Sequence, residues 1–192
     1  MKILGILLTI GWWVEVSAAD VVRWNQGVIV MSDGNVRQGE LAYQMSEMVL
    51  FRTAGEVSVL PAYKIHSFRY YDARENVNRK FVSRRSLSGT MDFYEMIVVG
   101  EVSVVRRFSH QVITNRKKSD IDDYDYFVCL QDNLVPLKQF RNKVYPNLLT
   151  SSHQMEIQIK THHLNPNRKA DAIQIIQLYN KATSVETLVA GI

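Results

Sequence analysis

The sequence predicts an α+β protein, in which an N-terminal antiparallel β-sheet or half-barrel of hairpins is followed by two or three C-terminal helices. Short runs rich in β-branched residues, separated by turn residues, occupy the chain from residue 21 to residue 137. Asp33-Gly34 lies between two such runs and is a strong hairpin signal. Beyond residue 137 the hydrophobic period changes to that of a helix. Strands first and helices last is the order of an α+β fold.

The first strands are expected on either side of the Asp33-Gly34 turn, at residues 27–31 and 39–43. Two more are expected at 48–52 and 56–60, and Pro61 keeps the latter out of a sheet centre because proline cannot donate to the ladder. The alternation from Tyr63 to Tyr71 places Phe68 and Tyr70 on one side and Ile65 on the other. Further along come a polar loop at 72–78, a short strand at 80–82, a polar connection at 83–90, a hairpin about Gly100, a loop at 114–123 and strands at 124–130 and 134–135.

The C-terminal region carries apolar residues at helical spacing. Leu137, Phe140 and Val144 predict a first helix, which Pro146 would end. The other expected helices lie near 151–163 and from Lys169 to Lys181.

The first eighteen residues have the features of a secretory signal peptide. Lys2 supplies a positive start, residues 3–14 are predominantly apolar, and Val16-Ser17-Ala18 suits signal peptidase, with cleavage between Ala18 and Ala19. Glu15 interrupts the apolar run too early for a spanning helix, so no stable membrane span is expected after cleavage. A buried N-terminal strand or a membrane anchor is the alternative. The expected organisation is a signal peptide at 1–18, a β-rich region at 19–137 and a helical region at 138–192, the last two forming one domain that is exported to the periplasm or the cell exterior.

Composition excludes several classes of protein. The 192 residues are 46% apolar and 22% charged, which fits neither a disordered chain nor a polytopic membrane protein. Cys129 is the only cysteine, so a disulfide framework and a cysteine-based zinc site are excluded. The absence of an Asn-x-Ser/Thr acceptor favours a bacterial exported protein.

Several turn and core motifs resemble a class of small secreted proteins, widespread in bacteria of the Bacteroidetes type and largely uncharacterised. They are Gly27-x-Ile29-x-x-x-Asp33-Gly34, Gly39-x-Leu41-x-Tyr43, Phe93-Tyr94-Glu95 with Gly100, and Ile175-x-x-Leu178-Tyr179-Asn180. The similarity covers most of the chain after the signal peptide. It implies export and the β-then-α order, and it implies no activity, cofactor or catalytic residue.

Acidic residues and histidines are the candidates for chemistry. Asp120, Asp122, Asp123 and Asp125 form an acidic cluster, but the spacing lacks the glycine and final glutamate of an EF-hand loop. The histidines are not spaced as zinc ligands, and no serine elbow or phosphate loop is present. No cofactor is therefore expected. A secreted hydrolase with a site assembled from the Asp120 to Asp125 carboxylates and one or more histidines is kept as an alternative.

Basic residues are in excess between residues 64 and 118 in a chain of formal charge +4. Arg84, Arg85, Lys117 and Lys118 are expected in connections, where they could converge at one end of the sheet and bind an anion. Arg106 and Arg107 are adjacent in a strand and must point to opposite faces. In an exported protein an acidic glycan is a better match than nucleic acid; a set of charges that only keeps the sheet soluble is the other interpretation. The sequence thus favours a non-enzymatic, envelope-associated or secreted interaction module, with an envelope protein or an anionic glycan as its partner.

Overall fold

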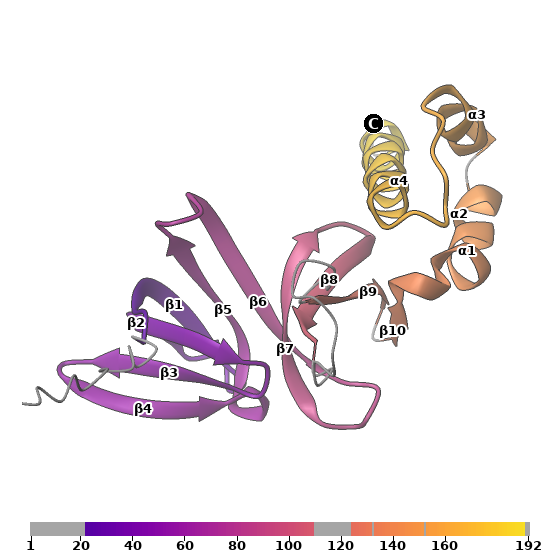
Figure 1. The fold of residues 1–192 in the computed structure, drawn as a ribbon. Coiled ribbons are helices and arrows are strands. Elements are labelled where there is room, and N and C mark those ends of the chain that lie inside the picture. The colour runs from indigo at the N-terminus through magenta and orange to yellow at the C-terminus, as the bar shows by residue number, and fades with distance from the viewer. Residues whose placement is uncertain (1–21, 110–123, 132, 152, 191–192) are drawn as a thin grey trace, which may run out of the picture.

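The computed structural model describes residues 22–109, 124–131, 133–151 and 153–190. These residues form one antiparallel sheet of ten strands followed by helices, so the predicted α+β class is confirmed (Figure 1). The strands are β1 (Asn25–Met31), β2 (Val36–Met45), β3 (Met48–Thr53), β4 (Glu56–Pro61), β5 (Ile65–Asp72), β6 (Val77–Arg85), β7 (Met91–Val98), β8 (Val102–Phe108), β9 (Tyr124–Leu130) and β10 (Asn133–Pro136).

The strand order is β10-β9-β8-β7-β6-β5-β1-β2-β3-β4. Strands adjacent in the sheet are also adjacent in the sequence, with one exception among the described strands, the pairing of β1 with β5. This pairing wraps β1–β5 into the half-barrel seen on the left of Figure 1. The start of β7 contacts the same unit, because the Phe93 N–H donates to the carbonyl oxygen of Ser46 between β2 and β3.

The turn between β1 and β2 has the conformation that Asp33-Gly34 predicts. Gly34 has φ +86°, a left-handed value that glycine adopts at little cost. The Asp33 carboxylate accepts the Asn35 N–H at 2.9 Å and fixes the turn. Strand β4 lies at the sheet edge and ends at Pro61. Proline has no backbone N–H, and it is tolerated at a sheet edge because the outer side of an edge strand has no partner strand.

Four α-helices follow the sheet in the described residues, rather than two or three. They are α1 (Phe140–Lys143), α2 (Tyr145–Ser151), α3 (His153–Thr161) and α4 (Lys169–Ala190), after a 3-10 turn at Leu137–Gln139. The break falls at Val144, and Pro146 lies in the first turn of α2 rather than ending a helix. Proline is tolerated there because the first helical N–H groups have no partner inside the helix.

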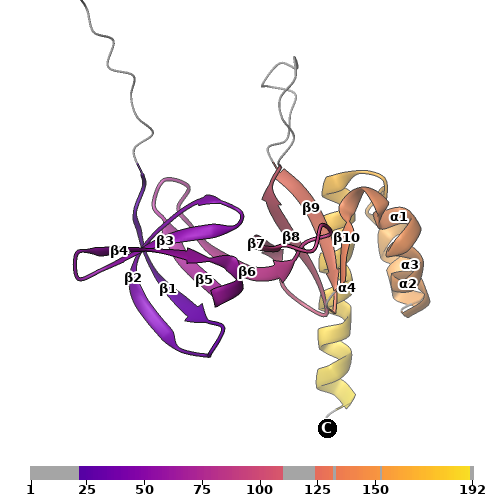
Figure 2. The same ribbon diagram turned by 90° about the horizontal axis from the view of Figure 1, so that it is seen from below.

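Two large hydrophobic cores lie at opposite ends of the sheet. The first fills the half-barrel, and the second lies between the sheet and the helices, which cover β8 and its neighbours (Figure 2). A smaller cluster surrounds Tyr94 and includes the buried Cys129. The half-barrel core includes Ile29, Leu41, Phe51, Phe68, Phe81 and Phe93, and the helical core includes Val104, Val128, Phe140, Met155, Ile175 and Ile176.

Two local expectations about strands were wrong. Ile65 and Phe68 are both buried although they were expected on opposite sides, because an irregularity in the β1–β5 register changes the alternation beside His66. Strand β6 runs to Arg85, so Arg84 and Arg85 lie in a strand and not in a connection. Among the described residues, no helix has both the length and the apolar character needed to cross a membrane.

Candidate functional site

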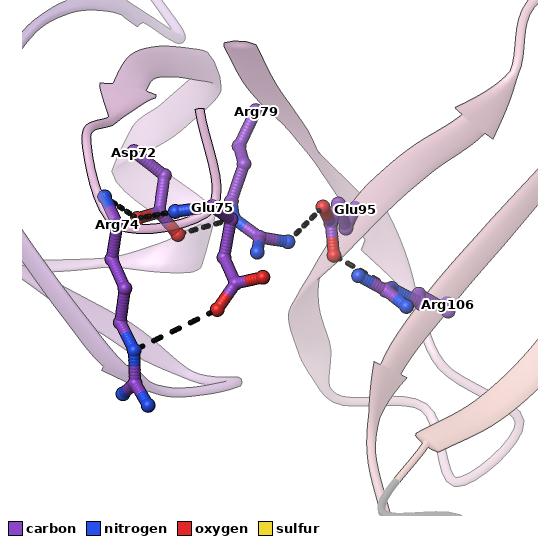
Figure 3. Close-up of polar contacts among 6 residues, drawn as sticks. All are labelled: Asp72, Arg74, Glu75, Arg79, Glu95 and Arg106. Carbon is purple, nitrogen blue, oxygen red and sulfur yellow. Dashed lines mark hydrogen bonds and ion pairs between the residues drawn. The ribbon is translucent and has the colours of Figure 1, made fainter. Parts of the chain in front are cut away.

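A chain of charged side chains crosses the sheet between the two cores. The register places Phe81 of β6 opposite Glu95 of β7, and Glu95 opposite Arg106 of β8. Directly opposed residues share a face, and so do residues two apart in a strand. Arg79, Phe81, Glu95 and Arg106 therefore lie on one face, with Asp72 reaching Arg79 from the end of β5. We call Asp72, Arg79, Glu95 and Arg106 the charge ladder (Figure 3).

Each carboxylate of the charge ladder is held by a guanidinium. Arg79 Nε donates to Asp72 Oδ2 at 2.8 Å, and Arg79 Nη1 donates to Glu95 Oε1 at 2.7 Å. Arg106 Nε donates to the second Glu95 oxygen at 2.7 Å. The side chains are largely withdrawn from water, with 9% of Glu95 and 16% of Arg79 exposed. Glu95 is the central member, because it joins two arginines from two different strands.

Burial and ion pairing shift the pKa values of the charge ladder in opposite directions. Burial alone would raise the pKa of Asp72, but the hydrogen bonds from Arg79 and from backbone N–H groups outweigh it, and the pKa is lowered. For Arg79, burial would lower the pKa, whereas hydrogen bonds to Asp72 and Glu95 raise it. Both groups are thus held in their charged forms, which is the condition for binding an ionic ligand rather than for transferring a proton at neutral pH.

Aromatic rings enclose the charge ladder. The Tyr43 and Phe81 rings lie 4.5 Å apart, Tyr70 stacks on Phe81 at 5.8 Å, and Phe108 stacks on Tyr124 at 4.8 Å. The Arg106 guanidinium lies 4.1 Å from the centroid of Tyr124, a cation–π contact. Burial raises the pKa of Tyr70 to about 12 and raises that of Tyr43 as well. These hydroxyls therefore remain protonated and can donate hydrogen bonds.

A pocket of about 240 Å³ opens beside the charge ladder, at the junction of the half-barrel and the β7–β9 part of the sheet. Its polar lining includes Arg23, Asp72, Arg79, Glu95 and Arg106, and its aromatic lining includes Tyr43, Tyr70, Phe81, Phe108 and Tyr124. The pocket combines charged groups with a hydrophobic wall, which is the usual composition of a small-ligand site.

The opposite face of the sheet holds a second ion pair. Arg107 donates to Asp92, whose side chain is almost fully buried. The Arg107 guanidinium also lies 5.7 Å from the Tyr94 ring and 5.5 Å from the Phe127 ring. Arg106 and Arg107 thus make contacts on opposite faces, which confirms the expectation for this pair. Arg107 also borders the pocket beside the charge ladder, although its guanidinium is paired with Asp92.

The structure describes two of the four predicted anion-binding residues, Arg84 and Arg85. Arg84 lies opposite Asp92 in the β6–β7 register. Arg85 is the next residue of the strand and points to the other face, where its guanidinium donates to the Gly89 carbonyl at 3.3 Å. Lys117 and Lys118 lie outside the described residues, as do Ala18 and Ala19 of the expected cleavage site.

The residues of the alternative hydrolase site are separated or lie outside the described part of the chain. Asp125 is in β9, opposite Arg107, whereas Asp120, Asp122 and Asp123 lie outside the described residues. His66, His162 and His163 are exposed on β5 and after α3, and His153 begins α3; His110 is not described. No group of three or more histidine, cysteine and acidic side chains is placed to bind a metal within the described ranges.

The charge ladder was not predicted from the sequence. Asp72 was interpreted as the start of a loop, and Arg106 only as the neighbour of Arg107. The available signal was Glu95, a charged residue within the apolar run from Phe93 to Val99. A buried carboxylate needs a cationic partner. Choosing Arg79 and Arg106 as partners requires the strand register, which the run itself does not contain.

Comparison of the chain with protein-family models, with curated proteins and with solved structures finds no match. The functional argument therefore rests on the charge ladder, the pocket and the sequence.

Proposed function

We propose that this chain is an exported, non-enzymatic binding module that acts at the bacterial envelope or outside the cell and holds an anionic glycan. The pattern of residues 1–18 supports export, and the resemblance to small secreted bacterial proteins agrees with it. The single observation that carries the binding function is the pocket beside the charge ladder, where every carboxylate is already bound by an arginine.

This pairing favours binding over catalysis. A general acid or base needs a pKa close to the working pH. The pKa of Asp72 is lowered, which moves it further from neutral pH. The lining also carries a surplus of positive charge: Arg107 is neutralised by Asp92, and the other three arginines, Arg23, Arg79 and Arg106, outnumber Asp72 and Glu95. A ligand with negative charge would balance that surplus.

Export is tested by fractionating native cells and sequencing the N-terminus of the isolated protein. We expect the protein in the exported fraction with Ala19 as its first residue. Cytosolic protein that retains Met1 would contradict the export part of the proposal.

Glycan binding is tested by chromatography of the mature protein on immobilised polygalacturonate. We expect retention that weakens as salt is added, because the screening length shortens to about 8 Å at physiological ionic strength. Replacing Arg84, Arg85, Lys117 and Lys118 together by serine tests the basic surface that the sequence suggested. Loss of retention in that variant would place binding there, whereas unchanged retention would leave the pocket as the site. A wild-type protein that is not retained would contradict the glycan proposal.

A further inference from the structure

We infer that the pocket beside the charge ladder binds a single uronic acid residue, a sugar that carries one carboxylate. This inference rests on the proposed function and names the part of the anionic glycan that the protein recognises. It is argued from the hydrogen-bonding groups that the fold leaves unused, from the aromatic wall, and from the volume and charge of the pocket.

The first argument concerns unused donors. Tyr43 and Tyr70 line the pocket, and neither hydroxyl has a hydrogen-bond partner among the described residues. The Tyr70 ring stacks on Phe81, which lies opposite Glu95 in the β6–β7 register. The guanidiniums of Arg79 and Arg106 bond through Nε and Nη1, which leaves the Nη2 donors of both groups for a ligand. A planar carboxylate matches the geometry of guanidinium N–H groups.

The second argument concerns acceptors. An ionised carboxylate offers about four lone-pair sites, and the two oxygens of Glu95 accept one arginine hydrogen bond each. The remaining sites can accept hydrogen bonds from sugar hydroxyls. An aromatic carboxylic acid is a poorer match, because it has no such hydroxyls. It would displace water from these polar groups without replacing the hydrogen bonds of that water, which loses affinity. A sugar ring supplies both hydroxyls and apolar C–H faces, and the latter can pack on the wall formed by Tyr43, Phe81 and Tyr124.

The third argument concerns size and charge. A pocket of about 240 Å³ is smaller than the ~300–1,000 Å³ that accommodates drug-sized ligands, which suits one sugar residue. The lining has four arginines, Arg23, Arg79, Arg106 and Arg107, against the two carboxylates Asp72 and Glu95. Arg107 is itself paired with Asp92, so the remaining groups carry one more positive than negative charge. A single carboxylate balances this surplus, a neutral hexose leaves it unbalanced, and a phosphate dianion exceeds it.

The test is titration of the mature protein with D-glucuronate, D-glucose and inorganic phosphate, followed by calorimetry or nuclear magnetic resonance. We expect a dissociation constant of about 1 mM for glucuronate, with binding of glucose and of phosphate each at least about tenfold weaker. Equal affinity for glucose and glucuronate would overturn the inference, because it would show that the carboxylate is not recognised. Tighter binding of phosphate than of glucuronate would overturn the inference, because it would identify a simple anion site. Absence of glucuronate binding would overturn the inference as well.

Variants separate ligand binding from structural support. The double variant Tyr43→Phe, Tyr70→Phe removes two hydroxyls that bond nothing in the described structure, so it should melt close to the wild-type temperature. We expect it to bind glucuronate about tenfold more weakly, which corresponds to about 1.4 kcal/mol. Tyr63→Phe is the matched control, since Tyr63 is 63% exposed and lies outside the pocket. Equal affinities in the double variant and the control would overturn the inference.

The outcomes also distinguish this inference from the proposed function. If polygalacturonate retains the protein but glucuronate does not bind, the glycan function stands and the pocket assignment fails. If glucuronate binds to the pocket of a protein that is found in the cytosol with an intact Met1, the pocket assignment stands and the exported function fails.

Discussion

The side-chain amide of Asn180 bonds both backbone polar groups of Val102, although the two residues are 78 positions apart. Asn180 Oδ1 accepts the Val102 N–H at 3.0 Å, and Asn180 Nδ2 donates to the Val102 carbonyl at 2.8 Å. The contact joins α4 to the first residue of β8, and Asn180 is buried. It also explains Gly100, because a Cβ there would lie 2.3 Å from the Asn180 amide.

We therefore expect Asn180→Ala to destabilise the fold by about 2 kcal/mol or more, because two buried backbone groups lose their partners. Gly100→Ala should also destabilise, through the clash with the amide. The double variant should lose less than the sum of the single variants, since truncating Asn180 makes room for the new methyl group. Urea unfolding measures all three. Asn78→Ala, at an exposed position, is the control, and a strictly additive double variant would contradict the proposed contact.

Gly34 tests the first hairpin. Gly34→Val should lower the free energy of unfolding by about 1 kcal/mol or more, because a β-branched residue at φ +86° is strained. Nothing lies within 4 Å of the added Cβ position, so the cost would come from the backbone and not from a clash. Gly34→Asn is the matched control and should be milder, since asparagine tolerates the left-handed region. Equal melting temperatures for the wild type and the valine variant would count against this reading of the turn.

The charge ladder makes a strong prediction at Glu95. Glu95→Leu should destabilise by about 3–5 kcal/mol, because it leaves two largely buried guanidiniums without their shared carboxylate. Glu156→Gln is the control: it breaks an ion pair with Lys160 in which both side chains are more than half exposed, and such pairs contribute about 0–1 kcal/mol. Chemical unfolding of both variants decides the matter. Similar losses in the two variants would show that the ladder is not a buried network.

Asp72 predicts how stability depends on acid. Its pKa is lower in the folded protein than in the unfolded chain, so the unfolded chain binds more protons as the solution is acidified. The contribution of Asp72 is complete above the unfolded pKa of about 3.9 and is lost as the pH falls through the lower folded value. Unfolding experiments from neutral to acidic pH should therefore show a steeper loss in the wild type than in Asp72→Asn. Parallel pH profiles would refute the assignment.

The parts of the fold that could be predicted depend on local signals. Asp33-Gly34 specifies its turn through backbone sterics within four residues, and Pro61 limits β4 through its missing N–H. The burial of both Ile65 and Phe68 could not be predicted, because the register irregularity depends on how β1 docks against β5. Likewise, the sequence around Arg84 and Arg85 is polar enough for a loop, and only the pairing with β7 extends β6 that far.

The candidate site was harder to predict for a related reason. The separation of Arg106 from Arg107 follows from strand geometry alone and was predicted correctly. The choice of Glu95 as the partner of Arg106, and of Asp72 as the partner of Arg79, depends on which residues face each other across strands. A run of alternating residues defines its two faces but contains no information about the register of its neighbours.

The β1–β5 pairing has a consequence for folding kinetics. All the other pairings of the described strands are between strands that are consecutive in the sequence. Their connections are short, apart from the one between β8 and β9, and short loops cost comparatively little entropy to close. Bringing β5 back to β1 requires the intervening hairpins to be placed first, so this step raises the contact order of the half-barrel. We expect Phe68→Leu, on that seam, to slow refolding in stopped-flow experiments, and Ile176→Val, on the buried face of α4, mainly to accelerate unfolding. The seam between the first and fifth strands, more than the helices, then sets the time the chain needs to reach its native state.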